Sequence, residues 1–580
     1  MNFKLKIPQQ LICWILFIAI SVMLIANVYF IHIDNSIAGT DSSNHLFASL
    51  EFYYHLKDIF IKGTYSLSQK FMAIYHLISR PGSYGGVYWP NGLNASTTIF
   101  YYIFQPSLFS AKLSLLPYIL ILLGATFYIG KHYGTTFNGL IAAYILFSYP
   151  IVFESSRQYQ LDFPLTAMVA LTIALLLRSR HFKDRLYSCL AGCSFGCAML
   201  IKGQAIIFII IPLAIVLIRV FYELRINKQE KKGVQYTLKN NIALFFLFFS
   251  IFMSFWWFGK TGQVKQQLFE HIFVAQKASY DGFTYVFKNK FSLKVLFFYI
   301  RAAIWSMGPL ALGVFVLLAF WAKEKVYSKP ICFFWSLSAF VVFSTVLTLK
   351  SPRFLMPILP AIALITSWQI SSLRKNKGVM VYIILLVGLL QFYSFSYAGV
   401  GKAEIVKKTY NYLPPSGYTV KPQMLKRNIV EVAEALKAIK QEIGVLKVGT
   451  ICAGDLDSFE VLYWLLLYEK NLDIVDLVQA PSRFAVEFES MDVVLFSSHS
   501  LYQYNLEWPQ GEELWELLLR RFPTRTEVQR PENLALWKFL GIKLEQAKTS
   551  FVLFGKVRDK QTGYNLYYVY KKVTDNICQK

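Results

Sequence analysis

The chain has 580 residues, of which 55% are hydrophobic and only 16% are charged, well below the roughly 25% that is usual in soluble domains. This composition excludes a string of soluble domains and indicates a protein with many membrane spans. The formal net charge of +25 would suit a nucleic-acid partner, but the Lys and Arg residues gather in alternate connections between apolar segments, so we expect no nucleic-acid partner.

A window of about 19 residues predicts a series of apolar spans along the chain. They cover residues 11–31, 108–130, 135–153, 163–178, 186–201, 204–221, 241–259, 300–321, 331–349, 354–370 and 379–397. We therefore expect a polytopic α-helical membrane protein with about eleven transmembrane helices. The first segment has no small-residue cleavage site followed by a soluble domain, which predicts a retained span and not a removed signal peptide.

The Lys and Arg residues distinguish the two sides of the membrane. One set of connections contains Lys4, Lys6, Arg178, Arg180, Lys183, Arg185, Lys228, Lys231, Lys232, Lys323, Lys325, Arg374, Lys375 and Lys377. The positive-inside rule places these connections, and the N-terminus with them, in the cytoplasm. The opposite short connections hold Arg157, Lys202, Lys350 and Arg353. Because these four cations go against the rule, we expect them to serve a function.

Two external stretches, residues 32–107 and 259–299, are long enough to build a site. The first contains Asp41, just after the first span. The residues that follow it are apolar at Leu46, Leu50, Tyr53 and Tyr54. This roughly helical spacing predicts an amphipathic segment from Asp41 to Lys57 that lies in the membrane interface.

A loop rich in Pro and Gly follows within the same external stretch. It carries Tyr84 and Trp89. Aromatic side chains held on such a loop can stack on a sugar or a lipid head group, and Tyr159 in a later external connection is a further candidate contact. An interfacial belt of Tyr and Trp is the alternative interpretation.

The tail of the chain changes character, because charged residues return and alternating patterns appear. Helices are predicted near 425–442, 459–469 and 512–521, β-like runs at Leu446–Ile451, Asp473–Val478 and Met491–Ser497, and a hairpin at Ser550–Val557 and Tyr564–Tyr570. We therefore expect a transmembrane domain over 1–397 and an extracytoplasmic α/β domain over 398–580. The tail contains no Gly-rich phosphate loop or nucleophile motif, so we place catalysis elsewhere.

Short motifs follow one another at the external ends of the predicted spans. They are Asp41 with His45 four residues on, Ser156–Leu165 entering the fourth span, Leu200–Gln204, and Lys350–Pro357 followed by Pro360. Over residues 10–370 this pattern resembles the C-type (GT-C) membrane glycosyltransferases. More narrowly, it is similar to the branch that contains the protein O-mannosyltransferases and the aminoarabinose transferase of lipid A.

The resemblance implies a sugar donor attached to a long polyprenyl phosphate and an acceptor on the extracytoplasmic face. Transfer to a hydroxyl needs a base, for which Asp41 is the first candidate and Asp162 the second catalytic carboxylate. The leaving polyprenyl phosphate gains negative charge, which fixed cations stabilise in a water-poor cavity. The candidates for binding this phosphate are Arg157, Lys202, Lys350 and Arg353. The family also implies inversion at the anomeric carbon.

Each candidate also has an ordinary structural interpretation. Asp41 could be a solvated loop carboxylate, and Asp162 precedes Phe163-Pro164 at a helix start, where Asp is a good N-cap. Lys202 could extend from a tight turn between two spans to reach the membrane surface. Lys350 and Arg353 could simply mark a helix end.

His45 lies four residues after Asp41 and would share a helix face with it. Such a pair can bind a divalent metal ion, while a hydrogen bond between imidazole and carboxylate is the alternative. The seven cysteines show no metal-ligand spacing. The sequence also departs from the family here, because mannosyltransferases carry an Asp-Glu pair where Asp41-Ser42 stands, and the spacing of Glu51 and Asp58 does not match.

The sequence thus predicts a membrane glycosyltransferase that moves one sugar from a polyprenyl-phosphate donor to a lipid, glycan or protein acceptor. A flippase or transporter of lipid-linked saccharides is the alternative from another class, but no internal repeat between the two halves is visible. A polysaccharide polymerase or ligase is a third interpretation. The chain has one glycosylation sequon, Asn94-Ala95-Ser96, and no long Ser/Thr/Pro-rich extension, which favours the inner (plasma) membrane of a bacterium.

Overall fold

The structure is a computed structural model in which the placement of most of the chain can be described. The described residues are 8–34, 36–37, 39–61, 66–79, 90–226, 232–254, 285–286, 298–308, 330–345, 349–373, 377–398, 427–443, 446–451, 472–476, 490–497, 551–558 and 565–572. The statements below concern these residues.

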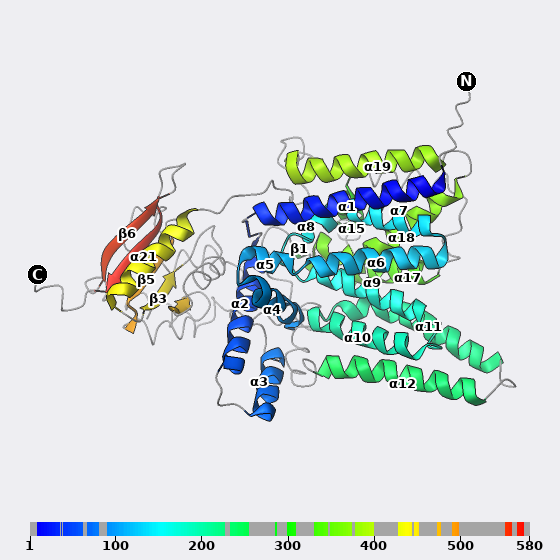
Figure 1. Cartoon of the computed structure of the whole chain (residues 1–580), viewed down its shortest axis with the longest axis horizontal. Helices are drawn as coiled ribbons and strands as arrows, with labels where there is room; N and C mark the ends of the chain where they lie inside the picture. The colour runs from blue at the N-terminus through cyan, green and yellow to red at the C-terminus, as the bar shows by residue number, and fades with distance from the viewer. Residues whose placement is uncertain are drawn as a thin grey trace, which may run out of the picture.

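The membrane part is a bundle of helices that run side by side (Figure 1). Its helices are α1 (Gln9–Ile33), α6 (Leu116–Tyr133), α7 (Thr136–Ser148), α9 (Asp162–Arg178), α10 (Arg185–Ile201), α11 (Ala205–Ile226), α12 (Lys232–Ser254), α15 (Phe298–Met307), α17 (Pro330–Thr345), α18 (Leu359–Ser372) and α19 (Lys377–Tyr393). Within the described residues, six helical stretches are long and apolar enough to cross a membrane. The prediction of a mostly helical membrane protein is confirmed, while the number of about eleven spans stays a prediction.

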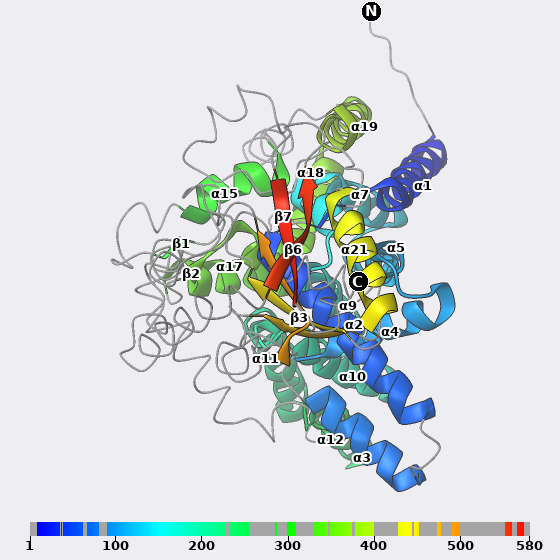
Figure 2. The same ribbon diagram turned by 90° about the vertical axis from the view of Figure 1, so that its left-hand side faces the viewer.

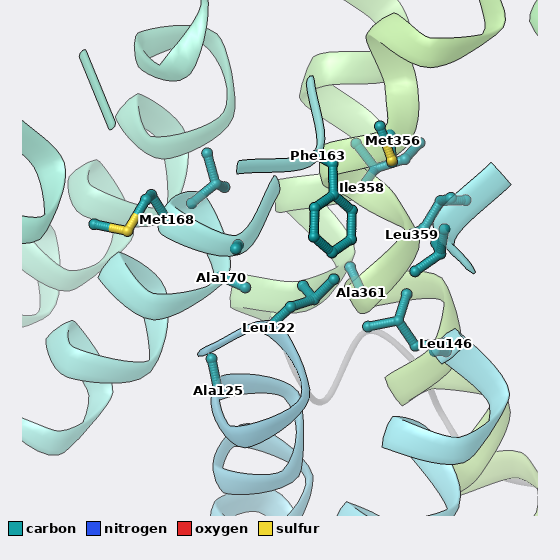
Figure 3. Close-up of a cluster of buried hydrophobic side chains, with 14 of the residues drawn as sticks. Leu122, Ala125, Leu146, Phe163, Met168, Ala170, Met356, Ile358, Leu359 and Ala361 are labelled. Carbon is teal, nitrogen blue, oxygen red and sulfur yellow. The ribbon is translucent and has the colours of Figure 1, made fainter. Parts of the chain in front are cut away.

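The core of the bundle lies between α6, α7, α9 and the chain from the 3-10 helix Pro352–Ile358 to α18. Figure 3 shows the side chain of Phe163 of α9 with Leu122, Leu146, Met356 and Leu359 around it. All five residues are buried. α9 is apolar on nearly every side, which is the pattern of a helix surrounded by protein. Its first residue, Asp162, is therefore held at the edge of a rigid core.

Two helices run across the direction of the bundle at the end where α1 finishes, namely α2 (Gly39–Ile61) and α3 (Leu67–Ser79) (Figure 1). The predicted helix after Asp41 is thus confirmed as α2. Leu46, Leu50 and Tyr53 are buried on it, and α4 (Gly92–Phe104) packs against it. Two short helices, α5 (Leu108–Leu113) and α8 (Pro150–Ser155), complete the described helices of this end.

The C-terminal part contains a five-stranded sheet in the order β4-β3-β5-β7-β6. Its strands are β3 (Leu446–Ile451), β4 (Leu472–Asp476), β5 (Val493–Ser497), β6 (Phe551–Arg558) and β7 (Asn565–Lys572), and α21 (Arg427–Ile443) packs against it. β3 pairs in parallel with β4 and β5, and the predicted hairpin is the antiparallel pair of β6 and β7.

This sheet lies beyond the end of the bundle where α2 crosses, and in the turned view it stands in front of the helix ends (Figures 1 and 2). The predicted helices near 459–469 and 512–521 fall outside the described residues. That 398–580 is a separate extracytoplasmic domain stays a prediction.

Candidate active site

Three of the predicted site residues, Asp162, Lys202 and Arg353, lie together. Lys202 Nζ lies 2.6 Å from Asp162 Oδ1, and Arg353 Nε lies 3.5 Å from Asp162 Oδ2. All three side chains are buried. Lys202 and Arg353 are 40 and about 190 residues away from Asp162 along the chain, and the fold brings them into one ionic cluster at the start of α9.

Local structure explains this meeting. α9 and α10 are adjacent helices joined by a short connection, so the first residue of α9 and the residue that ends α10 lie at the same end. Lys202 is the C-cap of α10 and has an extended backbone, which turns its side chain away from the helix axis toward its partner. Arg353 is in the first turn of the 3-10 helix Pro352–Ile358, which packs on α9.

The sequence-based N-cap interpretation of Asp162 is wrong. The N-cap of α9 is Leu161, and Asp162 is the first residue inside the helix. Its carboxylate is hydrogen-bonded to the Lys202 ammonium instead. A negative charge in the first turn also interacts favourably with the helix dipole, which adds to the reasons for an Asp at this position.

An aromatic ring covers part of this cluster. Lys202 Nζ lies 4.9 Å from the centre of the Phe354 ring, and Arg353 Cζ lies 5.8 Å from it. Two cations therefore share one carboxylate and one ring face in a place that excludes most water. Charges interact more strongly there than in bulk solvent, so the cluster can act strongly on a further anion.

Lys350 reaches the same region through its backbone. It lies on β2 (Leu349–Lys350), which pairs antiparallel with β1 (Tyr285–Val286), with Tyr285 opposite Lys350. β1 belongs to the external stretch 259–299, so the structure joins this stretch to the segment that carries Arg353. The side chain of Lys350 falls outside the described residues.

Arg157, the fourth predicted phosphate ligand, has different neighbours. Its Nε donates a hydrogen bond to Asn27 Oδ1 of α1. Its guanidinium carbon lies 4.1 Å from the ring centre of Phe30, and the rings of Phe153 and Phe392 are 5.2 and 5.1 Å away. Burial lowers the pKa of Arg157 to about 10, so it stays charged at neutral pH. Its Nη2 is buried and makes no hydrogen bond with the described residues.

The residues of the first external stretch are described in part. Asp41 lies in the first turn of α2, but its side chain is outside the described residues, as are Tyr84 and Trp89 entirely. His45 is buried on α2. Within the described part of the chain, no group of three or more His, Cys, Asp or Glu side chains is arranged to hold a metal ion.

Tyr159 is fully buried and takes part in a hydrogen-bond network with α4. Its hydroxyl lies 2.7 Å from Thr97 Oγ1 and donates to Asn94 Oδ1 at 3.4 Å. Asn94 in turn donates to Asn91 Oδ1 at 2.8 Å. Asn94 is the acceptor residue of the sequon, and in this structure it is enclosed within the protein. Tyr159 therefore holds α4 to the segment before α9.

One buried ion pair was missed by the sequence interpretation. Lys112 Nζ lies 2.6 Å from Asp34 Oδ2, and both side chains are almost entirely buried. Lys112 lies inside an apolar segment that we predicted as a span. An ionisable residue within such a segment is a signal of function by itself, so this observation could have identified it.

Comparisons with known proteins bear on the fold of this chain. Residues 90–255, which contain Arg157, Asp162 and Lys202, match the family model described as dolichyl-phosphate-mannose-protein mannosyltransferase. The crystal structure of ArnT from Cupriavidus metallidurans in the apo state is similar, with a TM-score of 0.56 and 13% sequence identity, over 97% of this chain and 98% of that chain. The chain has the GT-C fold of the C-type membrane glycosyltransferases.

A second structure of ArnT from Cupriavidus metallidurans, bound to undecaprenyl phosphate, is similar to this GT-C chain with a TM-score of 0.54 and 13% identity, again over 97% of this chain and 98% of that chain. The resemblance inferred from the short motifs is thus confirmed at the level of the fold. A comparison of the sequence with curated proteins finds no match.

Proposed function

We propose that this chain is an integral membrane glycosyltransferase. It moves one sugar from a polyprenyl-phosphate donor to an acceptor hydroxyl on the extracytoplasmic face. The observation that carries the proposal is the buried cluster of Lys202 and Arg353 on Asp162, at the end of a GT-C bundle that α2 crosses (Figure 1). One structure with this fold holds undecaprenyl phosphate, which supports a lipid phosphate as part of the donor.

The two cations suit the charge that develops during transfer. As the bond between the anomeric carbon and the phosphate oxygen breaks, that oxygen gains negative charge. Lys202 and Arg353 are already held by Asp162 before the reaction, so they need little rearrangement to stabilise this oxygen. We assign Lys350 and Arg157 to the same phosphate, since they are the remaining cations of the short external connections.

We infer different roles for the two candidate carboxylates. Asp162 accepts from the Lys202 ammonium at 2.6 Å and contacts Arg353 as well, so both of its oxygens are already engaged by cations. We therefore assign Asp162 to positioning the cations and Asp41 to the base. Asp41 takes the proton of the acceptor hydroxyl, whose oxygen bonds to the anomeric carbon while the polyprenyl phosphate leaves from the opposite face. This single displacement inverts the anomeric configuration.

The remaining assignments follow from the same proposal. His45, on the helix of Asp41, is a candidate contact of the sugar or the acceptor together with Tyr84 and Trp89, while the buried Tyr159 would act by holding α4 in place. The region 398–580, whose sheet lies beyond the end of the bundle where α2 crosses (Figure 1), helps to bind a lipid, glycan or protein acceptor. The membrane is the plasma membrane of a bacterium, with the N-terminus in the cytoplasm.

Transfer can be measured with the purified protein in liposomes. A panel of radiolabelled polyprenyl-phosphate sugars is offered with membrane extract as acceptor, and the product is separated from the donor. We expect label to appear in the acceptor with a changed anomeric configuration. Donor that crosses the bilayer without being consumed would instead identify a flippase, and transfer of a whole glycan chain would identify a polymerase or ligase.

A further inference from the structure

The Asp34–Lys112 pair lies at the connection between α1 and α2, and the proposed function assigns it no role. Lys112 Nζ donates to Asp34 Oδ2 at 2.6 Å, to the backbone oxygen of Asp34 at 3.1 Å and to that of Ser36 at 2.7 Å. A lysine ammonium has three protons to donate. All three protons are thus donated to Asp34 and Ser36, which follow the end of α1.

The connection itself is folded around the same carboxylate. The Ser36 hydroxyl donates to Asp34 Oδ1 at 2.8 Å, and the Asp34 backbone N–H donates to Phe30 O at 2.9 Å, which closes the last turn of α1. Asp34 therefore joins the end of α1, the following turn and Lys112 into one unit. α2 begins at Gly39, and Asp41 lies in its first turn.

Lys112 is presented by a rigid support. α5 is a short helix whose start is fixed by a capping box: the Ser107 hydroxyl accepts from the Ser110 backbone N–H, and the Ser110 hydroxyl accepts from the Ser107 backbone N–H. Ser110 also donates to Gln105 O at 2.7 Å. A capped support of this kind keeps the ammonium in a defined place relative to α6, which follows directly.

The far half of α2 is held by other contacts. Ser49 Oγ lies 2.9 Å from Tyr101 Oη, and the ring of Tyr53 packs against those of Tyr101 and Tyr102 at 5.6 and 5.0 Å between centres. α4 thus holds α2 at Ser49 and Tyr53. Asp41 lies at the other end of α2, which follows the connection from α1 directly.

We propose that Lys112 is a positioning residue, which fixes the direction in which the chain leaves α1 and so places Asp41 at the site. This inference rests on the proposed function in one respect, since Asp41 is there the base. Removal of the ammonium would release the backbone oxygens of Asp34 and Ser36, and the first turn of α2 would lose its defined position. A displacement of about 1 Å in a reacting group is sufficient to slow a reaction about 100-fold.

The decisive variant is the double substitution Asp34→Leu/Lys112→Met. Lys112→Met alone leaves a buried carboxylate without its cation and can fail to fold. Replacing both members of a buried ion pair by apolar residues usually preserves stability, but it cannot restore the hydrogen bonds to the two backbone oxygens. A purely structural role predicts that the double variant recovers both stability and turnover, whereas a positioning role predicts that it recovers stability alone.

We would measure hydrogen exchange and transfer kinetics on the full-length protein in detergent micelles, with Lys183→Met as the matched control. Lys183 pairs with Glu223 at 2.8 Å on an exposed surface. In the double variant we expect faster exchange over 34–45 with unchanged exchange over 46–61, and kcat reduced about 10- to 100-fold at constant donor KM. Wild-type exchange over 34–45, or wild-type kcat, in the folded double variant would overturn the proposal.

The exchange measurement needs no substrate. It therefore decides whether Lys112 holds the connection even where the wild type transfers no sugar, and that result would count against the proposed function alone.

Discussion

Asp162 shows how one carboxylate can hold together two cations from distant parts of the chain. It is buried with Lys202 and Arg353, and removal of one member of such a group leaves uncompensated charge in the interior, at a cost of about 3–5 kcal/mol. In the proposed mechanism, the same arrangement fixes the cations in positions where they bind a phosphate. Stability and function thus depend on the same residue, and a variant of Asp162 affects both.

Glu51 is a second carboxyl group at this end of the molecule, on α2. Burial raises the pKa of Glu51 from its ordinary value of 4.5 to about 8, and its Oε2 makes no hydrogen bond within the described residues. The folded protein therefore keeps a proton that the unfolded chain loses above about pH 4.5. The stability that this group contributes is fully present below that pH and is lost as the pH rises toward about 8.

We predict that Glu51→Gln flattens this pH dependence. The amide cannot ionise, so the variant should lose less stability than the wild type as the pH is raised from about 5 to about 8. The measurement is the thermal unfolding midpoint of the protein in detergent at a series of pH values. Parallel curves for the two proteins would show that Glu51 ionises alike in the folded and unfolded chain.

At the scale of elements, the contact between α4 and α10 links the external helices to the cations. Gly92 is the first residue of α4, and a Cβ added to it would lie 2.6 Å from the backbone oxygen of Leu200. Lys202 follows two residues later. Because backbone cannot move aside as a flexible side chain can, a larger residue at this position must push the end of α10 and the Lys202 ammonium with it.

We therefore predict that Gly92→Ala destabilises the protein by about 1–3 kcal/mol and lowers the transfer rate by up to about 100-fold. Gly124→Ala is the matched control, since a Cβ at Gly124 of α6 meets no atom within 4 Å. Thermal unfolding and transfer are measured for both. If the two alanine variants behave alike, the close approach at Gly92 does not constrain the site.

For the whole molecule, one end of the bundle brings together α2, which carries Asp41, and the ionic cluster of Asp162, Lys202 and Arg353. α2 and α3 cross this end, and the C-terminal sheet lies beyond it (Figures 1 and 2). Asp162 and Lys202 lie at this end because α9 begins there and α10 finishes there. The basic connection between α9 and α10, which contains Lys183, lies at the opposite end, which the positive-inside rule assigns to the cytoplasm.

This topology predicts which engineered cysteines an impermeant thiol reagent reaches. Leu67, on α3, is 86% exposed, and the Lys183 side chain is 52% exposed. In cells whose plasma membrane is accessible from outside, Leu67→Cys should be labelled directly and Lys183→Cys only after permeabilisation, each compared with the unsubstituted protein. The reverse pattern would place the site in the cytoplasm and contradict a donor used on the outer face.

The sequence predicted the features that depend on local pattern. Apolar length indicated the spans, helical spacing after Asp41 indicated α2, and alternation indicated β3 at its observed bounds. The exceptions to the positive-inside rule singled out Lys202 and Arg353 before their common partner was known. The sequence predicted a functional role for Asp162 only in part, because an Asp at a helix start is explained equally well by N-capping.

The features that escaped prediction depend on packing between distant segments. Lys112 and Asp34 are 78 residues apart, and neither belongs to a motif. The rings around Arg157 come from α1, α8 and α19, so only the folded bundle shows that its neighbours differ from those of Lys202. A linear pattern carries no information on which helix ends meet.

The central claim is that external cations stabilise the leaving phosphate while Asp41 activates the acceptor. The most direct test is the transfer rate at saturating donor for Lys202→Met and Asp41→Asn, beside Lys183→Met as a cation removed from the opposite end. We predict that the first two lose about 100-fold or more in kcat while remaining folded, and that Lys183→Met retains the wild-type rate. Wild-type turnover in a folded Lys202→Met protein would contradict the account.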